Sequence, residues 1–155
     1  MDRLPVTSTS ISKTEIRADT SGIGNGGTIT IGASESVSIQ GASLISTSTT
    51  QEGQGGAITV GAPEVTVDAG AGIFATVGRD ATGDGGSVTI TAGTSIAVRG
   101  TDESGNLRSL IDSSTFGAGK GGAITLRAPT VSVTGGGVIG AAPNFFDTTA
   151  GGTVD

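Results

Sequence analysis

The chain contains no cysteine and no histidine among its 155 residues. The absence of cysteine excludes a disulfide framework, and the absence of both residues excludes a Cys/His zinc site. Tryptophan and tyrosine are missing too, and aromatic residues make up only 3% of the chain. A conventional globular core filled with large side chains is therefore excluded, and a thin core of stacked small and β-branched residues is favoured.

Basic residues are scarce, with 8 Lys and Arg against 14 Asp and Glu, and the sequence pI is about 4.4. A nucleic acid or an anionic membrane surface is therefore an unfavourable partner, because the protein carries the wrong sign of charge. No apolar run approaches the length of a membrane-spanning helix. The opening MDRLPVTSTS lacks the apolar segment of a secretory signal. We expect no nucleic-acid partner and no membrane insertion.

Glycine is abundant, with 29 residues, and much of it lies in one recurring phrase, Gly-x-Gly-Gly followed by an alternating stretch. The copies are GNGGTITI from Gly24, GQGGAITV from Gly53, GDGGSVTI from Gly83, GKGGAITL from Gly119 and a degenerate TAGGTVD from Thr149. The second glycines of the pairs (Gly27, Gly56, Gly86, Gly122 and Gly152) are 29, 30, 36 and 30 residues apart. A nearly constant interval with a fixed phrase predicts a repeat architecture.

Three strand-like stretches recur within each repeat. The first follows the glycine pair (Ile29/Ile31, Ile58/Val60, Val88/Ile90, Ile124/Leu126), and the second follows it (Val37/Ile39, Val65/Val67, Ile96/Val98, Val131/Val133). The third carries one isoleucine per repeat (Ile45, Ile73, Ile111, Ile139), with Ile16 as an earlier member. Strict alternation places the aliphatic side chains on one face of a strand. Each interval fits a strand and a short turn, with no room for a helix, and one long interval marks an insertion within Arg99–Ser109.

Aligned strands in successive repeats must pair in parallel, and parallel connections are overwhelmingly right-handed. We therefore predict an all-β fold, a right-handed parallel β-helix with three strands per coil, about 30 residues per coil and about five coils. Residues 1–155 form one domain: 1–27 a partial first coil, 27–152 four full coils, 153–155 the start of a further coil, and 99–109 an insertion loop. The glycines are expected at corners where the backbone needs a positive φ.

The two ends of the chain fall at complementary points of the same coil, without capping segments. Two explanations follow: the chain is a piece of a longer array, or copies stack end to end through their open strand edges. The partner is then a second copy or the adjacent coils of a longer chain. The candidate end-stacking residues are Ile16, Phe145, Phe146 and Val154.

The sequence offers no catalytic, cofactor-binding or metal-binding set, and we predict a protein that is not an enzyme and needs no cofactor. Glycosidase and lyase chemistry needs paired carboxylates, or a metal plus a base, on one outer face, but the acids Glu35, Glu64, Asp68 and Asp112 do not align in one column. The variable position of the glycine phrase reads Asn25, Gln54, Asp84, Lys120 and Ala150, and a lysine there argues against a repeated calcium site. An isolated calcium near Asp80 and Asp84 stays open.

Two outer features are candidates for a specific contact. The insertion carries Asp102, Glu103, Asn106 and Arg108, with Arg99 nearby, and is the best place for a carbohydrate or receptor to bind. The other feature is a row of outward threonines suited to binding ice (Thr30, Thr59, Thr89, Thr125). The neighbouring row is only half hydroxylated, and ordinary β-propensity also explains exposed threonine.

The phrases GGTITIGASESVSIQGASLISTST and GGAITVGAPEVTVDAGAGIFATV resemble the repeats of filamentous-haemagglutinin-like adhesins, exoproteins exported by two-partner secretion and abundant in cyanobacteria. The resemblance covers about residues 16–155, although the coil from Gly86 departs through its insertion and the coil from Gly122 through GGGVIGAAPNFF. It implies an extracellular or cell-surface β-helix shaft that acts as a structural protein, with surface glycans as partners of the adhesin. It assigns no functional residues, because the repeats of that family are structural.

Overall fold

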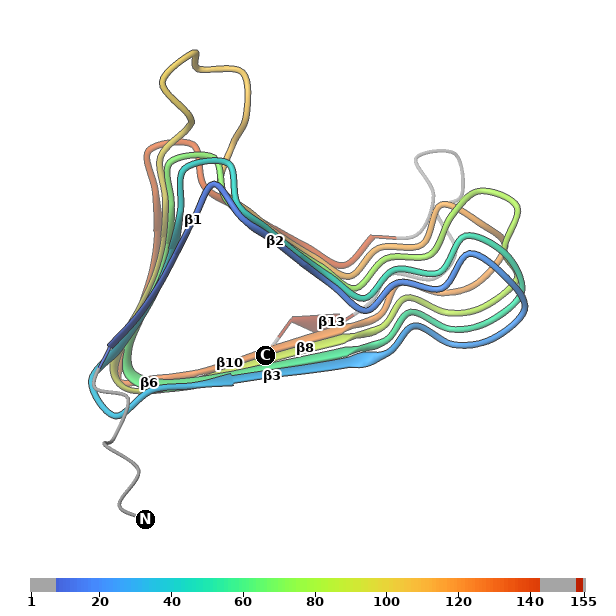
Figure 1. Cartoon of the computed structure of the whole chain (residues 1–155), viewed down its shortest axis with the longest axis horizontal. Helices are drawn as coiled ribbons and strands as arrows, with labels where there is room; N and C mark the ends of the chain where they lie inside the picture. The colour runs from blue at the N-terminus through green and yellow to red at the C-terminus, as the bar shows by residue number, and fades with distance from the viewer. Residues whose placement is uncertain (1–7, 143–152, 155) are drawn as a thin grey trace.

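The computed structural model describes residues 8–142 and 153–154, and these form stacked parallel coils without a helix. Viewed down the stacking axis, the body of each coil is a triangle, and successive coils superimpose (Figure 1). The predicted all-β fold of parallel coils about 30 residues apart is confirmed, as a β-solenoid of about four turns.

The three sides of the triangle correspond to the three stretches of the repeat. The first side holds β3 (Thr28–Gly32), the start of β6 (Ala57–Asp68), the start of β8 (Ser87–Arg99), β10 (Ala123–Arg127) and β13 (Thr153–Val154). The second side holds β1 (Ser8–Ser12), β4 (Ser36–Gln40), the ends of β6 and β8, and β11 (Thr130–Thr134). The third side holds β2 (Glu15–Arg17), β5 (Leu44–Ser46), β7 (Gly72–Phe74), β9 (Leu110–Asp112) and β12 (Val138–Gly140).

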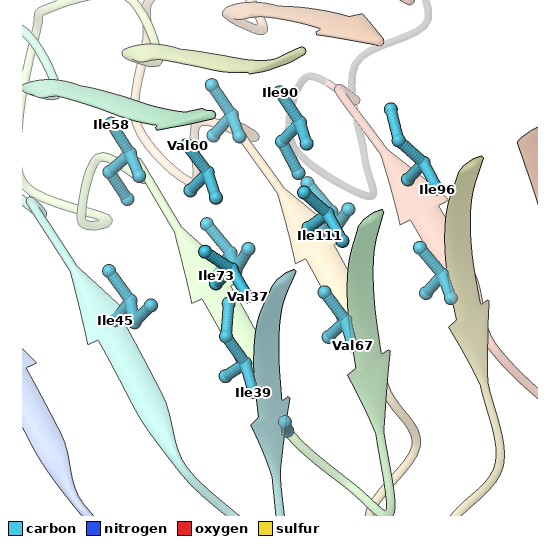
Figure 2. Packing of buried hydrophobic residues seen from close by; sticks show 14 of the residues in the cluster. Val37, Ile39, Ile45, Ile58, Val60, Val67, Ile73, Ile90, Ile96 and Ile111 are labelled. Carbon is cyan, nitrogen blue, oxygen red and sulfur yellow. The ribbon is translucent and has the colours of Figure 1, made fainter. Parts of the chain in front are cut away.

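The core is built from columns of aliphatic side chains, each contributed by equivalent positions of successive coils. On the third side Ile16, Ile45, Ile73, Ile111 and Ile139 are direct partners across neighbouring strands. Ile45, Ile73 and Ile111 are completely buried, and Figure 2 shows them with the valines and isoleucines of the other two sides. Since β-branched side chains fit the pleated surface and each buried one contributes about 1.5–3 kcal/mol, these columns hold the coils together.

The glycine pairs do not serve as positive-φ corners, so that expectation was wrong. None of Gly27, Gly56 and Gly86 has a positive φ. A Cβ on Gly56 would instead overlap the carbonyl oxygen of Gly27, and a Cβ on Gly86 would overlap that of Gly56. The pair is glycine because the backbones of adjacent coils approach too closely there for any side chain.

Positive φ occurs at another place, the corner between the second and third sides. The first residue of this corner is left-handed in each coil, at Lys13 (50°), Gly41 (66°), Ala69 (53°), Gly100 (77°) and Gly135 (58°). These residues directly follow the second-side strands, so the turn geometry is the same in successive coils. The expected role of glycine at positive φ therefore exists, but at this corner and at the first glycine of two phrases, Gly24 (143°) and Gly53 (142°), and not at the glycine pairs.

Between the third side and the glycine pair, the chain leaves the triangle as an arm. The spacing of the strands in the sequence had predicted only a short turn there. The arms (residues 19–26, 48–55, 76–85 and 114–121) project from one corner and lie on one another (right side of Figure 1). Each arm is closed at its neck by a hydrogen bond from the second glycine of the pair, as from the N–H of Gly56 to the carbonyl of Thr47 at 2.8 Å. The stacked arms thus extend each coil beyond its three strands.

Candidate functional site

The face formed by β11, β12 and β13 is one end of the described stack, and it exposes core positions. Val131 and Val133 face the solenoid interior like Ile96 and Val98 one coil below, their partners in the parallel ladder. Ile96 and Val98 are fully buried, whereas Val131 and Val133 are 43% and 45% exposed. The difference arises because an inner coil is covered on both sides. This end is therefore an apolar surface bounded by strand edges.

The face formed by β1, β2 and β3 is the opposite end of the described stack. Within the described residues each of these strands has a ladder partner on one side only, namely β4, β5 and β6. Ile11 and Ile29 keep 7% and 8% of their surface exposed, and Ile16 packs partly buried against the core. Free N–H and C=O groups along such an edge can pair with a further parallel strand.

The structure places the predicted end-stacking residues as follows. Ile16 lies on the β1–β2–β3 face, and Val154 in β13 pairs with Ile124 at the other end. Phe145 and Phe146 lie outside the described residues. The sequence analysis did not single out Val131 and Val133 as end-face residues. Their signal was present, since they belong to the last complete second stretch.

The segment between β8 and β9, where the insertion was predicted, forms a hairpin that projects from a corner of the triangle (top of Figure 1). Thr101 and Arg108 form an antiparallel bridge at its base. The Asp102 carboxylate accepts hydrogen bonds from the Ser104 hydroxyl at 2.5 Å and from the N–H groups of Asn106 and Leu107, both at 2.9 Å. These bonds, led by that of Ser104, lower the pKa of Asp102 below its ordinary value. Asp102 therefore braces the hairpin.

The hairpin brings the four predicted contact residues together with different roles. Glu103, Asn106 and Arg108 are exposed, and the Asn106 side-chain amide donates to the Ser104 hydroxyl at 3.0 Å. Arg99, expected beside the acidic pair, instead donates to Asp68 at 3.0 Å. A cleft of about 220 Å³ lies under the hairpin, lined by Lys13, Gly41, Ala42, Ala69, Asp102 and Glu103. The hairpin thus offers mostly polar groups, with half-exposed Leu107 as its one large aliphatic side chain.

The threonine row is formed in register on the outer surface of the first side. Thr30 pairs with Thr59, Thr59 with Thr89, and Thr89 with Thr125. The flanking row, also in register, is Thr28, Ala57, Ser87 and Ala123. The continuous part of the hydroxyl array is therefore only one residue wide, which does not favour the ice-binding alternative.

A shallow groove of about 570 Å³ follows the glycine phrases along the stacking axis. The variable residues of the phrase line it, and they bond between coils. Asn25 Oδ1 accepts the N–H of Gln54 at 2.9 Å, and Asp84 Oδ1 accepts the N–H of Lys120 at 2.7 Å. No group of three or more Asp or Glu residues able to hold a metal ion occurs within 8–142. The groove residues are thus accounted for by contacts between coils.

Comparisons with known proteins do not assign the chain to a family. No family model matches the sequence, and neither the curated proteins nor the solved structures contain a match. In the described ranges no helix is long and apolar enough to cross a membrane. The fold defines the class: the chain is a β-solenoid repeat protein of about four turns. The likeness to filamentous-haemagglutinin-like repeats rests on the repeat phrases.

Proposed function

We propose that the protein is a non-enzymatic structural shaft, a segment of a secreted or cell-surface adhesin. The observation that carries this proposal is the continuity of the aliphatic columns. On the third side the isoleucine column runs without interruption from Ile16 to Ile139. On the second side the apolar column reaches the end face at the half-exposed Val131 and Val133. Coils can be added at such a face in the same geometry, which is the property a shaft requires.

The outer wall supports a structural role. Outward positions of the first and second sides are dominated by Thr, Ser, Ala and Gly, as in the Thr30–Thr59–Thr89–Thr125 row. The ionic contacts within residues 8–142 are Arg17 with Glu15 and Asp19, and Arg99 with Asp68, all at half-exposed arginines. Such pairs contribute little to stability. The rod is therefore held by the coil-to-coil ladder and the core, which is suited to bearing load along its length.

The extracellular setting follows from the repeat resemblance and is tested on intact cells of the source. An antibody raised against the purified chain should label the surface of unpermeabilised cells, and electron microscopy should show stiff rods bearing the label. Labelling confined to permeabilised cells would overturn the adhesin setting. Compact round particles in place of rods would overturn the shaft.

A second function, adhesion through the 99–109 hairpin, is favoured by one observation. The hairpin departs from the repeating wall and is braced internally by Asp102, so Glu103, Asn106 and Arg108 are presented in a defined arrangement. A glycan array is probed with the intact chain and with a variant in which residues 101–108 are replaced by two glycines. Loss of binding in the variant supports the hairpin as the contact, and identical binding by both proteins removes it.

A further inference from the structure

We propose that the groove along the glycine phrases binds a linear, uncharged oligosaccharide, which lies along the stacking axis across successive coils. The groove is on the flank of the rod, where the arms meet the first side. The proposal therefore goes beyond the shaft function and does not depend on what covers the ends of the stack. The floor, the two walls and the charge of the groove each match such a ligand.

The floor of the groove is bare backbone. It is formed by glycines of the four phrases (Gly26, Gly55, Gly56, Gly85, Gly86, Gly121 and Gly122). A Cβ on Gly55 would overlap the backbone nitrogen of Gly86, and a Cβ on Gly85 would overlap the carbonyl oxygen of Ser113. Since stacking excludes side chains here, the floor stays flat from coil to coil. The C–H face of a sugar ring can pack against such a surface over its whole width.

The peptide groups of the floor are already hydrogen-bonded between coils. The N–H groups of the first glycines of the pairs donate to carbonyl groups of the next coil, at 2.8–3.0 Å (Gly26 to Gln54, Gly55 to Asp84, Gly85 to Lys120). An extended peptide that binds as an added strand needs a row of free N–H and C=O groups, so this floor does not suit one. A nucleic acid is disfavoured by the net charge of −6.

Two rows of side chains border the floor. The row on the arm side consists of the variable residues of the phrases (Asn25, Gln54, Asp84 and Lys120). The row on the first side follows the glycine pairs (Thr28, Ala57, Ser87 and Ala123). Amide and hydroxyl groups both donate and accept hydrogen bonds, as the hydroxyl groups of a sugar do. A sugar chain lying on the floor therefore finds hydrogen-bonding partners along both of its edges.

Two residues of the arm-side row are held in place before any ligand binds. Asn25 Oδ1 accepts the N–H of Gln54 at 2.9 Å, and Asp84 Oδ1 accepts the N–H of Lys120 at 2.7 Å. Each bond between coils occupies one oxygen and leaves the other polar atom, Nδ2 of Asn25 and Oδ2 of Asp84, for a ligand. Such preorganisation lowers the entropic cost of binding.

The charge and the shape of the groove select the kind of glycan. Asp84 and Lys120 are the charged residues in its lining, and their opposite charges favour an uncharged ligand. The lining spans four coils in register, from Thr28 to Ala123. At about 4.8 Å per coil this is a straight track of about 14 Å. A flat, extended β-1,4-linked chain matches it better than an α-1,4-linked chain, which coils.

The first test is an NMR titration of the purified chain with cellohexaose. We expect the amide signals of the floor glycines, such as Gly26, Gly55 and Gly85, to shift, and those of the 99–109 hairpin to stay unchanged. Maltohexaose, the α-linked isomer, should cause smaller shifts at the same concentration. An unchanged spectrum up to the solubility limit of cellohexaose would overturn the proposal. So would equal shifts with both sugars, or larger shifts with the anionic trigalacturonate.

Variants then place the contact on the groove. Gln54→Ala and Ser87→Ala remove one hydrogen-bonding side chain from each wall, and each should weaken cellohexaose binding about 2- to 10-fold. The matched controls Gln51→Ala, on the same arm, and Thr66→Ala, on the second side, should bind like the unmodified chain. Unchanged affinity in both groove variants, with β-sheet circular dichroism retained, would refute the groove. Weakening by Asn106→Ala would assign the contact to the hairpin instead, and either failure leaves the shaft function standing.

Discussion

Replacing Ile73 with alanine tests the claim that stacked aliphatic columns hold this protein together. Ile73 has no exposed surface and lies in the ladder between Ile45 and Ile111, which are also fully buried. Shortening an isoleucine to alanine in a core costs about 2–5 kcal/mol, and the cost is highest where the surroundings cannot close the cavity. The backbone hydrogen bonds of the parallel ladder keep adjacent coils apart at about 4.8 Å, so the cavity cannot collapse. We therefore expect a loss of about 4 kcal/mol in the free energy of unfolding.

The measurement is urea unfolding followed by circular dichroism. Ile73→Val, which removes a single methyl group, should cost only about 0.5–1.5 kcal/mol. Ile139→Ala, at the partly buried end of the same column, should cost about half as much as Ile73→Ala, because Ile139 buries less surface. Equal losses at the two positions, or a loss at Ile73 below about 1 kcal/mol, would refute the column as the source of stability.

Four further outcomes are expected. Gly56→Ala should destabilise the protein by about 3 kcal/mol or more, because the new Cβ overlaps the Gly27 carbonyl, whereas Gly61→Ala, with open space around it, should be neutral or slightly stabilising in the same urea unfolding. Ser113→Ala should leave the free energy of unfolding unchanged or raise it, because the buried Ser113 hydroxyl has no hydrogen-bond partner among the described residues; a loss of about 2 kcal/mol would contradict this. The folded pKa of Asp102 is lowered, so its bracing of the hairpin is complete above about pH 4 and is lost as the pH falls through that lower value; the Leu107 amide proton shift, followed by NMR, should titrate with it, and an invariant shift would contradict the bracing. Thermal hysteresis should be absent at high protein concentration, because the continuous hydroxyl row is one residue wide; hysteresis abolished by Thr59→Lys would instead establish an ice-binding face.

The parts of the fold that were predictable are those that depend on side-chain period. Alternation of Ile and Val with Thr and Ser assigns one face of each strand to the core, and the recurrence of this pattern sets which coil positions stack. Ile45, Ile73 and Ile111 are direct ladder partners as the spacing predicted. The insertion was equally visible, because a single long interval interrupts otherwise regular spacing.

The arms and the glycine pairs were not correctly predicted, because backbone contacts decide them. The neck of each arm is closed by a main-chain bond, as between Gly56 and Thr47, which leaves no hydrophobic pattern in the sequence. In the sequence, a glycine that is needed because two backbones approach closely cannot be distinguished from a glycine that is needed for a left-handed turn. Only the structure showed that Gly56 belongs to the first kind and Gly41 to the second.

For the candidate contact surfaces, too, the sequence predicted one part and the structure decided the rest. The sequence located the 99–109 hairpin and named its polar residues, but Asp102 acts within the hairpin and Arg99 pairs outside it. It also pointed to end stacking, yet the exposed core positions at that end are Val131 and Val133. Their exposure depends on which coil they occupy, and only their place in the last complete second stretch indicates it, because their residue pattern is the same as in the inner coils.

The sequence by itself determined that this is a coiled stack of parallel strands, since side-chain period and repeat length are local properties read along one chain. The tertiary structure decided where the backbones touch, where the turns are left-handed, how the arms stack and which apolar residues reach the end faces. These depend on distances between coils about thirty residues apart, and such distances exist only after the coils have been laid on one another.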